Sequence, residues 1–324
     1  MTAPPATMGI SQTRRRAFAI AAWATLGFNV LVILGGTIVR ATGSGDGCGD
    51  TWPKCGDQFI PPNATVETVI EFSHRVSSFL AGVGVAIVVV LALWIFAKGD
   101  IVRKAAVWSG VFLVLEALLG AALVIFGWVD DDVSVGRMIV VPLHLANTFL
   151  LLGSLTLTAW WGSGFPNPRR SLRSSDGRWL IAGAAIIVFI GATGALNALA
   201  DTVFPADSVV GDLSDKFGAT APLLSNLRIV HPIVSVIGGM TVAWVATSRS
   251  RGGSPMTQRA ATAVTLIVLS QMFIGIANIF FLTPLSLQII HLMVADALWI
   301  AFVVFSASFL GDPVTPKTEV GVAA

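Results

Sequence analysis

The sequence predicts an all-α integral membrane protein with eight transmembrane helices. Of its 324 residues, 55% are hydrophobic and only 12% are charged, and the mean hydropathy is +0.81. A soluble domain carries about 25% charged residues because its surface must be hydrated, so most of this surface faces lipid. Apolar runs long enough to cross about 30 Å of hydrocarbon recur along the chain. We expect the eight spans at residues 17–39, 68–97, 105–127, 138–161, 179–198, 223–247, 260–281 and 286–309.

The first apolar run follows three arginines, Arg14 to Arg16, as the apolar segment of a secretory signal peptide would. It is too long for such a segment, and no convincing small-residue cleavage site follows it. We therefore interpret 17–39 as an uncleaved first span. The continuous apolar runs also exclude a transmembrane barrel, whose strands would show alternating segments of about ten residues.

Charge alternates strictly between successive loops. Basic residues occupy the N-terminal tail and the loops after the second, fourth and sixth spans: Arg14, Arg15, Arg16, Lys98, Arg103, Lys104, Arg169, Arg170, Arg173, Arg178, Arg249, Arg251 and Arg259. Two of the intervening loops are acidic, with Asp130, Asp131, Asp132, Asp201, Asp207, Asp212 and Asp215. Lys and Arg are retained on the cytoplasmic side, so we expect both termini in the cytoplasm and the chain in the cell (plasma) membrane. Membrane lipid is an expected partner, and nucleic acid is not.

The two halves of the chain look like copies of one another. The segment GGTIVRATGSG (35–45) at the end of the first span resembles GATGALNALAD (191–201) in the fifth. The segment LEALLGAAL around Glu116 in the third span corresponds to SQMFIGIAN around Gln271 in the seventh. Because each copy has four spans, both copies share one orientation, and we expect a pseudo-two-fold axis along the membrane normal.

This repeat predicts two tandem four-helix bundles. The expected parts are a cytoplasmic N-terminal tail (1–16), an N-terminal bundle (17–161), a cytoplasmic linker (162–178), a C-terminal bundle (179–309) and a cytoplasmic C-terminal tail (310–324).

The only four histidines lie on alternate spans, near the outer membrane face. They are His74, His144, His231 and His291, at a common depth of roughly 10 Å. Packing or hydrogen bonding explains a single such histidine, but ionisable groups in lipid are costly and usually functional. Zinc would need clustered tetrahedral ligands. Paired imidazoles in a four-helix bundle suit haem iron better, since a flat ring fits between helices that each supply an axial ligand.

Small residues near this layer would leave room for a large ring, although they also allow close helix packing. They are Gly35, Gly36, Gly120, Gly191, Gly194 and Gly275. Haem propionates would point toward the outer surface, where four arginines are available as partners. These are Arg40, Arg75, Arg137 and Arg228, and simple interfacial snorkelling is the alternative for each.

The repeat is asymmetric next to two of the histidines. Glu71 stands three residues before His74, whereas Arg228 stands three residues before His231. Residues at i and i+3 share a helix face, so one pocket has a carboxylate nearby and the other a cation. A cation suits an anchoring site, and a partly buried carboxylate suits proton-coupled chemistry. Glu71 could instead be a residue of the first helical turn, where the helix dipole stabilises a negative charge.

These segments resemble the haem A synthase family. The resemblance is carried by GGTIVRATGSG, CGDTWPKC (48–55) and EFSHR (71–75), then by PLHLAN, RIVHP and IIHLM around the later histidines, and it extends over all eight spans. It implies oxidation of a methyl group of haem O to a formyl group, by two successive hydroxylations and loss of water, to supply haem A to terminal oxidases.

The resemblance also implies roles for individual residues. His74 and His144 would hold the substrate haem, and His231 and His291 would ligate a resident haem b that serves in electron transfer. Glu71 would take a proton or stabilise positive charge at the methyl carbon. The haem O-forming prenyltransferase and oxidase assembly factors are the implied protein partners.

Cys48 and Cys55 lie in the first outer loop with six residues between them. A disulfide fits both this spacing and the oxidising compartment. In the family this pair is linked to haem handling, and a purely structural bridge is the alternative. Some relatives carry a second cysteine pair in the outer loop after the fifth span, and residues 199–222 here contain none.

Other functions share some of these features. A di-haem b electron-transfer cytochrome would use the same histidines, but it gives no reason for Glu71 or the cysteine pair. A transporter with tandem repeats would show broken helices at the midplane, whereas the polar layer here lies near one face. For Glu116 and Asp296, two more carboxylates within spans, we favour a polar interhelix contact for the first and assign no role to the second.

Overall fold

The computed structural model describes residues 10–61, 64–205, 224 and 227–313, and these residues form helices without a strand. Eight of the helices are long and apolar enough to cross a membrane, as predicted. The protein is therefore a multi-pass membrane protein. The helices are α1 (Gln12–Ala41), α2 (Val66–Ile95), α3 (Ile101–Ile125), α4 (Val135–Gly162), α5 (Ser175–Val203), α8 (Val230–Ser250), α9 (Pro255–Phe280) and α10 (Leu285–Gly311).

Most helices begin a few residues before the apolar run that predicted them, because each starts at a polar cap. The hydroxyl of Ser11, for example, accepts the backbone N–H of Arg14, so α1 includes the arginines before its apolar run. Thr65, Asp100, Ser134, Ser174 and Ser254 act in the same way at α2, α3, α4, α5 and α9. Such caps satisfy backbone donors that have no partner inside the helix.

The sixth spanning helix differs from its predicted range of 223–247. Residue 223 lies outside the described residues, as do 1–9 of the N-terminal tail, 314–324 of the C-terminal tail and the loop aspartates Asp207, Asp212 and Asp215. A 3-10 turn (Leu227–Ile229) leads directly into α8. His231 therefore lies in the first turn of α8, where Pro232 is tolerated because its missing N–H would have no helical acceptor.

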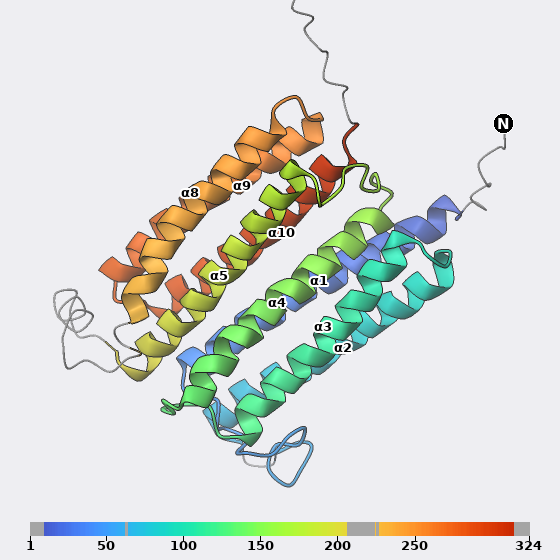
Figure 1. Cartoon of the computed structure of the whole chain (residues 1–324). Coiled ribbons are helices and arrows are strands. Elements are labelled where there is room, and N and C mark those ends of the chain that lie inside the picture. Colours follow the sequence, from blue (N-terminus) through green and yellow to red (C-terminus); the bar gives the residue numbers. More distant parts are fainter. Residues whose placement is uncertain (1–9, 62–63, 206–223, 225–226, 314–324) are drawn as a thin grey trace, which may run out of the picture.

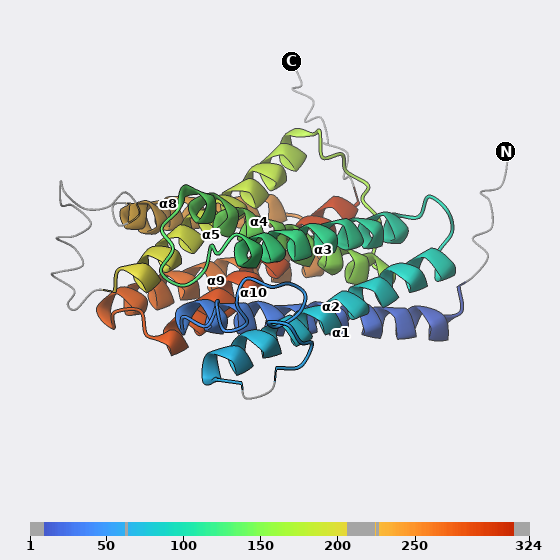
Figure 2. The ribbon, with the colours of Figure 1, turned by 90° about the horizontal axis from the view of Figure 1, so that it is seen from below.

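The helices form two layers of four, as the view from below shows (Figure 2). One layer has the order α8, α5, α4, α3, and the other has the order α9, α10, α1, α2. In Figure 1 the same helices separate into two groups, with α1 to α4 in one and α5, α8, α9 and α10 in the other. Each helix of a group contacts its neighbours in chain order, and the first contacts the last. The pseudo-two-fold axis between the groups stays a prediction.

The two groups meet where α4 packs on α5 and α10 and where α1 packs on α10. Among these helices, α4 and α10 carry the largest buried faces. The indole of Trp299 stacks on Phe149 with ring centroids 5.6 Å apart, and its Nε1 donates to the Phe149 carbonyl at 2.5 Å. A methyl group at Gly153 would lie 3.1 Å from this indole. A glycine on α4 therefore admits the large side chain of α10 and lets the two groups pack closely.

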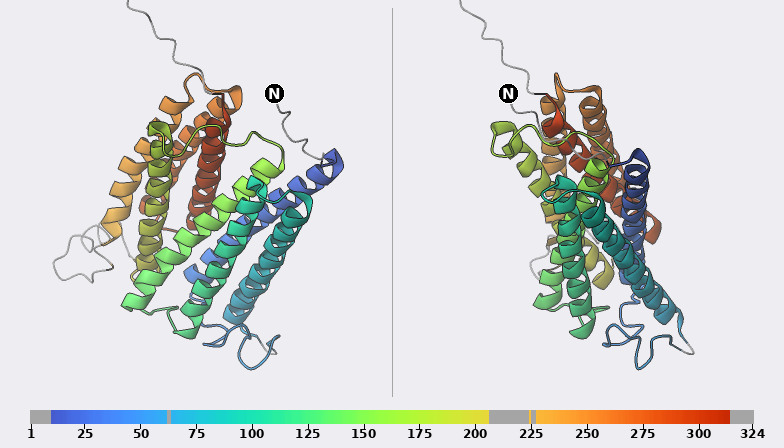
Figure 3. Two further views of the ribbon diagram at one scale, coloured as in Figure 1. Left: turned by 45° about the vertical axis from the view of Figure 1, so that its right-hand side comes forward. Right: turned by 90° about the vertical axis from the view of Figure 1, so that its right-hand side faces the viewer.

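The loop over 42–61 and the turn between α3 and α4 lie together at one end of the molecule (Figure 3). The start of α1 and the end of α10 lie at the opposite end. This arrangement follows from the even number of spans. It brings the histidine-bearing starts of α2, α4, α8 and α10 to the end that holds the loop after α1. This loop contains the Cys48–Cys55 disulfide and is called the disulfide loop below.

Close packing of α5 on α10 gives a direct test of the fold. A methyl group at Gly183 would stand 2.6 Å from the Phe302 ring, whereas one at Gly27 would meet nothing within 4 Å. We expect Gly183→Ala to destabilise the protein by about 1–3 kcal/mol, as overpacking does. Gly27→Ala should be neutral or stabilise by about 0.5–1 kcal/mol. Thermal unfolding in one detergent compares the two, and equal midpoints would contradict this packing.

Candidate functional site

The structure places each of the four histidines near the start of its helix, at the end of the molecule that holds the disulfide loop. His74 and His144 belong to α2 and α4, and His231 and His291 belong to α8 and α10. Among the described residues, no group of three or more His, Cys, Asp or Glu side chains is arranged to hold a metal ion.

A glycine of the preceding spanning helix faces every one of these imidazoles. A methyl group at Gly36 of α1 would lie 3.1 Å from His74 Cε1, and one at Gly120 of α3 would lie 3.7 Å from His144 Cε1. The second half repeats the arrangement: Gly194 of α5 would come within 2.9 Å of His231, and Gly275 of α9 within 3.6 Å of His291. Gly35 also faces His74, but Gly191 instead packs against Phe149.

The imidazoles of His231 and His291 have the separation of two ligands on one metal ion. Their ring centroids are 6.3 Å apart and their planes are nearly perpendicular, at 86°. A metal–nitrogen bond of about 2 Å on each side of one iron places two imidazole centroids about 6 Å apart. The hydroxyls of Thr193 and Ser235 each lie 3.3 Å from His231 Nδ1. This pair therefore fits the axial positions of a haem.

The imidazoles of His74 and His144 have different neighbours. Nδ1 of His74 is buried and has no hydrogen-bond partner among the described residues. Nδ1 of His144 lies 3.4 Å from Oε1 of Glu116, without the geometry of a hydrogen bond. The two histidines of the first half therefore differ in their surroundings, because only His144 has a carboxylate oxygen near its Nδ1.

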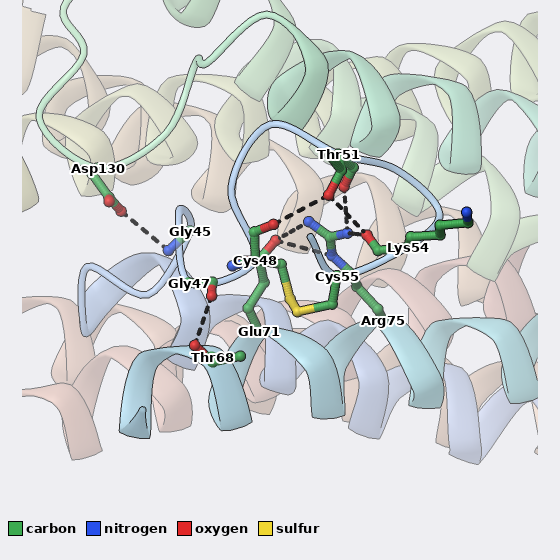
Figure 4. A network of polar contacts seen from close by, with 10 residues as sticks. All are labelled: Gly45, Gly47, Cys48, Thr51, Lys54, Cys55, Thr68, Glu71, Arg75 and Asp130. Carbon is green, nitrogen blue, oxygen red and sulfur yellow. Dashed lines mark hydrogen bonds and ion pairs between the residues drawn. A yellow bond between two sulfur atoms is a disulfide. The ribbon is translucent and has the colours of Figure 1, made fainter. Parts of the chain in front are cut away.

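Glu71 is almost fully buried, with 3% exposed, and it anchors the disulfide loop to α2 (Figure 4). Its Oε2 accepts the backbone N–H of Cys48 at 2.7 Å, and its Oε1 forms an ion pair with Arg75. Arg75 in turn donates to the carbonyls of Thr51 and Lys54 at 2.7 and 2.5 Å. The carboxylate is thus held in place by the loop above it, one helical turn from His74.

A disulfide between Cys48 and Cys55 closes this loop. The backbone N–H of Gly56 donates to the Cys48 carbonyl at 3.0 Å, and Thr68 of α2 donates to the Gly47 carbonyl at 2.7 Å. A side chain at Gly47 would collide with the α2 backbone at Glu67, so only glycine permits this approach. The disulfide loop therefore lies directly on the first turn of α2, where it presents the Cys48 N–H to the carboxylate.

The loop also contacts the turn between α3 and α4. Oδ1 of Asp130 accepts the backbone N–H of Gly45 at 3.1 Å, and burial raises the pKa of this carboxyl. Arg137 of α4 donates to the carbonyls of Val129, Asp130 and Asp132 in the same turn. The two loops of the first half at this end of the molecule are therefore joined into one polar layer near its histidines.

The other two arginines brace the end of α5. Arg40 reaches from α1 across to the second half, where it donates to the Ala198 carbonyl, to Thr202 and to Oε1 of Gln288. Arg228, with 2% exposed, donates to the carbonyls of Ala200 and Phe204 and lies 3.4 Å from Asp201. Cations near a helix C-terminus satisfy its free carbonyls. Contact of the four arginines with propionates stays a prediction.

The polar interhelix contact predicted for Glu116 is confirmed, because its side chain is hydrogen-bonded to Asn147 and Thr148 of α4. The position of Glu116 beside His144 was not predicted. The signal was in the sequence, because Asn147 and Thr148 follow His144 by one helical turn. Asp296 of α10 is completely buried, and neither of its oxygens has a hydrogen-bond partner among the described residues.

Comparison with known proteins places these features in a family. The model of the family described as cytochrome oxidase assembly protein matches residues 19–69 and 63–303. Proteins from two strains of Thermus thermophilus, both named protoheme IX farnesyltransferase, are each 41% identical over 293 residues. The matched segment is 89% of this chain and 48% of each of those proteins. The chain thus spans about half the length of these relatives.

Two further relatives match a shorter segment of the chain. A heme A synthase of Bacillus cereus strain AH187 is 44% identical over 98 residues, which are 30% of this chain and 32% of that protein. A heme A synthase of Bacillus anthracis strain CDC 684 shows the same values.

The glycines that face the histidines give a matched test of the second pocket. Alanine at position 194 would press on His231, whereas alanine at position 275 would make only an ordinary contact with His291. We expect Gly194→Ala to lower haem affinity about tenfold, as loss of correct ligand orientation does. Gly275→Ala should bind normally. Titration of the apoprotein with haem, followed by absorbance, measures both, and equal affinities would show that Gly194 does not position the imidazole.

Proposed function

The chain belongs to the cytochrome oxidase assembly protein family, as its resemblance to haem A synthases predicted, and we propose that it converts haem O to haem A. The observation that carries this proposal is the layer of four imidazoles, each on its own helix and each faced by a glycine. Such a layer suits two haems, one in each half. A methyl group of the substrate would become a formyl group through two hydroxylations and loss of water.

We propose different roles for the two histidine pairs. His74 and His144 would hold haem O, because the neighbouring carboxylate Glu71 belongs to their half. His231 and His291 would hold a resident haem b, which supplies electron transfer when bound. The 6.3 Å separation of this second pair supports the assignment. Membership of a haem-modifying family and the carboxylate beside one pocket both favour the synthase over a di-haem electron carrier.

Glu71 is the proposed catalytic residue of the first half. Its carboxylate would accept a proton from the reacting methyl carbon or stabilise positive charge there. The Cys48 N–H and Arg75 hold the carboxylate in position, because each donates to a different oxygen. The disulfide loop supplies the first of these donors. We propose that the Cys48–Cys55 bridge acts by keeping this loop on α2.

We propose Arg137 as the first partner for a haem propionate. Its Nε is buried and has no hydrogen-bond partner among the described residues, while its Nη1 is held by three carbonyls. A guanidinium that is held in position and has an N–H without an acceptor is suited to bind an anionic group. In Arg40, Arg75 and Arg228 at least two guanidinium nitrogens already contact protein acceptors, so contact with a propionate would require each of them to share more of its donors.

The charge distribution of the loops supports a cell-membrane protein with both termini in the cytoplasm. The haem O-forming prenyltransferase is the proposed partner. In the Thermus relatives, a segment similar to this chain belongs to a longer polypeptide that is named for farnesyl transfer to protoheme IX. Proximity of the two activities would let a poorly soluble haem pass between them. Oxidase assembly factors are the proposed recipients of haem A.

The conversion can be tested in a host that lacks haem A. The chain is expressed with and without a haem O-forming enzyme, and the membrane haems are extracted and separated by chromatography. We expect haem A or its hydroxylated precursor only when haem O is supplied. Unchanged haem O beside normally bound haem b would favour the electron carrier. Haem O formed by this chain alone would instead indicate farnesyl transfer.

The same assay tests Glu71. We expect Glu71→Gln to reduce conversion at least about 100-fold, the lower range for loss of acid–base catalysis, while both haems remain bound. Glu67→Gln is the matched control, since it neutralises an exposed carboxylate one turn earlier on α2. Chromatography gives conversion and absorbance gives haem content. Loss of all bound haem in Glu71→Gln would show a structural role instead.

A further inference from the structure

The two halves differ in the side chain that stands beside the second histidine of each pair. Glu116 lies one helical turn before Gly120, which faces His144, and Gln271 lies one helical turn before Gly275, which faces His291. The two positions are therefore equivalent in the repeat, but one holds a carboxylic acid and the other an amide.

Glu116 is fixed against α4 from two sides. The side-chain amide of Asn147 donates to its Oε2 at 2.5 Å, and the hydroxyl of Thr148 donates to its Oε1. Asn147 also donates to the Phe112 carbonyl at 2.8 Å, which ties the contact to the α3 backbone. The amide nitrogen of Asn147 can only donate, so Oε2 of Glu116 acts as an acceptor. Its Oε1 lies 3.4 Å from His144 Nδ1.

The second half has only neutral groups at the corresponding places. Oε1 of Gln271 and Nδ1 of His291 are buried and have no hydrogen-bond partner among the described residues. His231 has the hydroxyls of Thr193 and Ser235 as its neighbours. Carboxylate contact with a haem-pocket histidine is thus confined, among the described residues, to the first half.

We propose that Glu116 is a positioning residue that makes His144 an electron-rich axial ligand of the substrate haem. This inference rests on the proposed function. A carboxylate next to the free nitrogen of a metal-bound imidazole fixes its orientation and increases its basicity. A negative charge this close to a metal-bound imidazole also stabilises the oxidised, more positive form of the haem. Glu116 then lowers the potential of the first-half haem, and no carboxylate at the equivalent place in the second half does the same.

The test is a redox titration of the haem-loaded protein, followed by optical spectra. At a fixed potential near the midpoint of the first-half haem, Glu116→Gln should raise the ratio of reduced to oxidised haem about tenfold, the lower range for loss of an outer-shell partner. The second-half haem should be unaffected. An unchanged ratio with both haems bound, or an equal change in both haems, would overturn the proposal.

The reverse substitution provides an independent second variant. Gln271→Glu introduces a carboxylate at the equivalent place and leaves the first half intact, so we expect it to lower the potential of the second-half haem. If Glu116→Gln loses its haem, this variant decides: a lowered potential supports the proposal and an unchanged one overturns it. The readout does not require turnover. Failure of haem O conversion would therefore count against the proposed function and leave these potentials measurable.

Discussion

A bilayer offers no water to a buried side chain, so each imidazole of this protein must find its space and its partners inside the helix bundle. Glycine on the preceding spanning helix provides the space in all four cases, with Gly36, Gly120, Gly194 and Gly275 facing one histidine each. This contact sets how closely α1 approaches α2, α3 approaches α4, α5 approaches α8 and α9 approaches α10. Each glycine–histidine contact joins two helices that are neighbours in the same bundle. The spacing of helices in both halves therefore depends on these four contacts.

Buried charged side chains have polar partners in a second set of contacts, at the end of the molecule that holds the histidines. Glu71 pairs with Arg75 under the disulfide loop, and Arg228 lies against Asp201 at the end of α5. Arg40 crosses from the first half to Gln288, which precedes His291 on α10 by three residues. The two halves are thus joined near the histidines, while Trp299 and Phe149 join them deeper in the bundle. Leaving any of these charges without its partner would cost several kcal/mol in so apolar a setting.

Hydropathy and spacing predicted the eight spans and the alternate helices of the four histidines, because these features depend on the local composition of each segment. The exact start of a helix depends on a single cap such as Ser11, and the start of α8 at Val230 depends on the turn before it. Most contacts between distant segments depend on how the helices pack, which the local sequence does not specify. The guanidinium of Arg40 reaches α5 and α10, and Glu116 lies beside His144 only because α3 packs on α4. Gly191 was expected to leave room beside a histidine, but the side chain that it faces is Phe149 of α4.

The central claim is that each half holds one haem through its own histidine pair. The most direct measurement is the identity and amount of haem bound to four single variants, His74→Ala, His144→Ala, His231→Ala and His291→Ala, each purified after expression with a haem O-forming enzyme. Variants of the first pair should lose haem O and haem A but keep haem b, and variants of the second pair should lose haem b but keep haem O. Equal loss of every haem in all four variants, or loss of none, would contradict this claim.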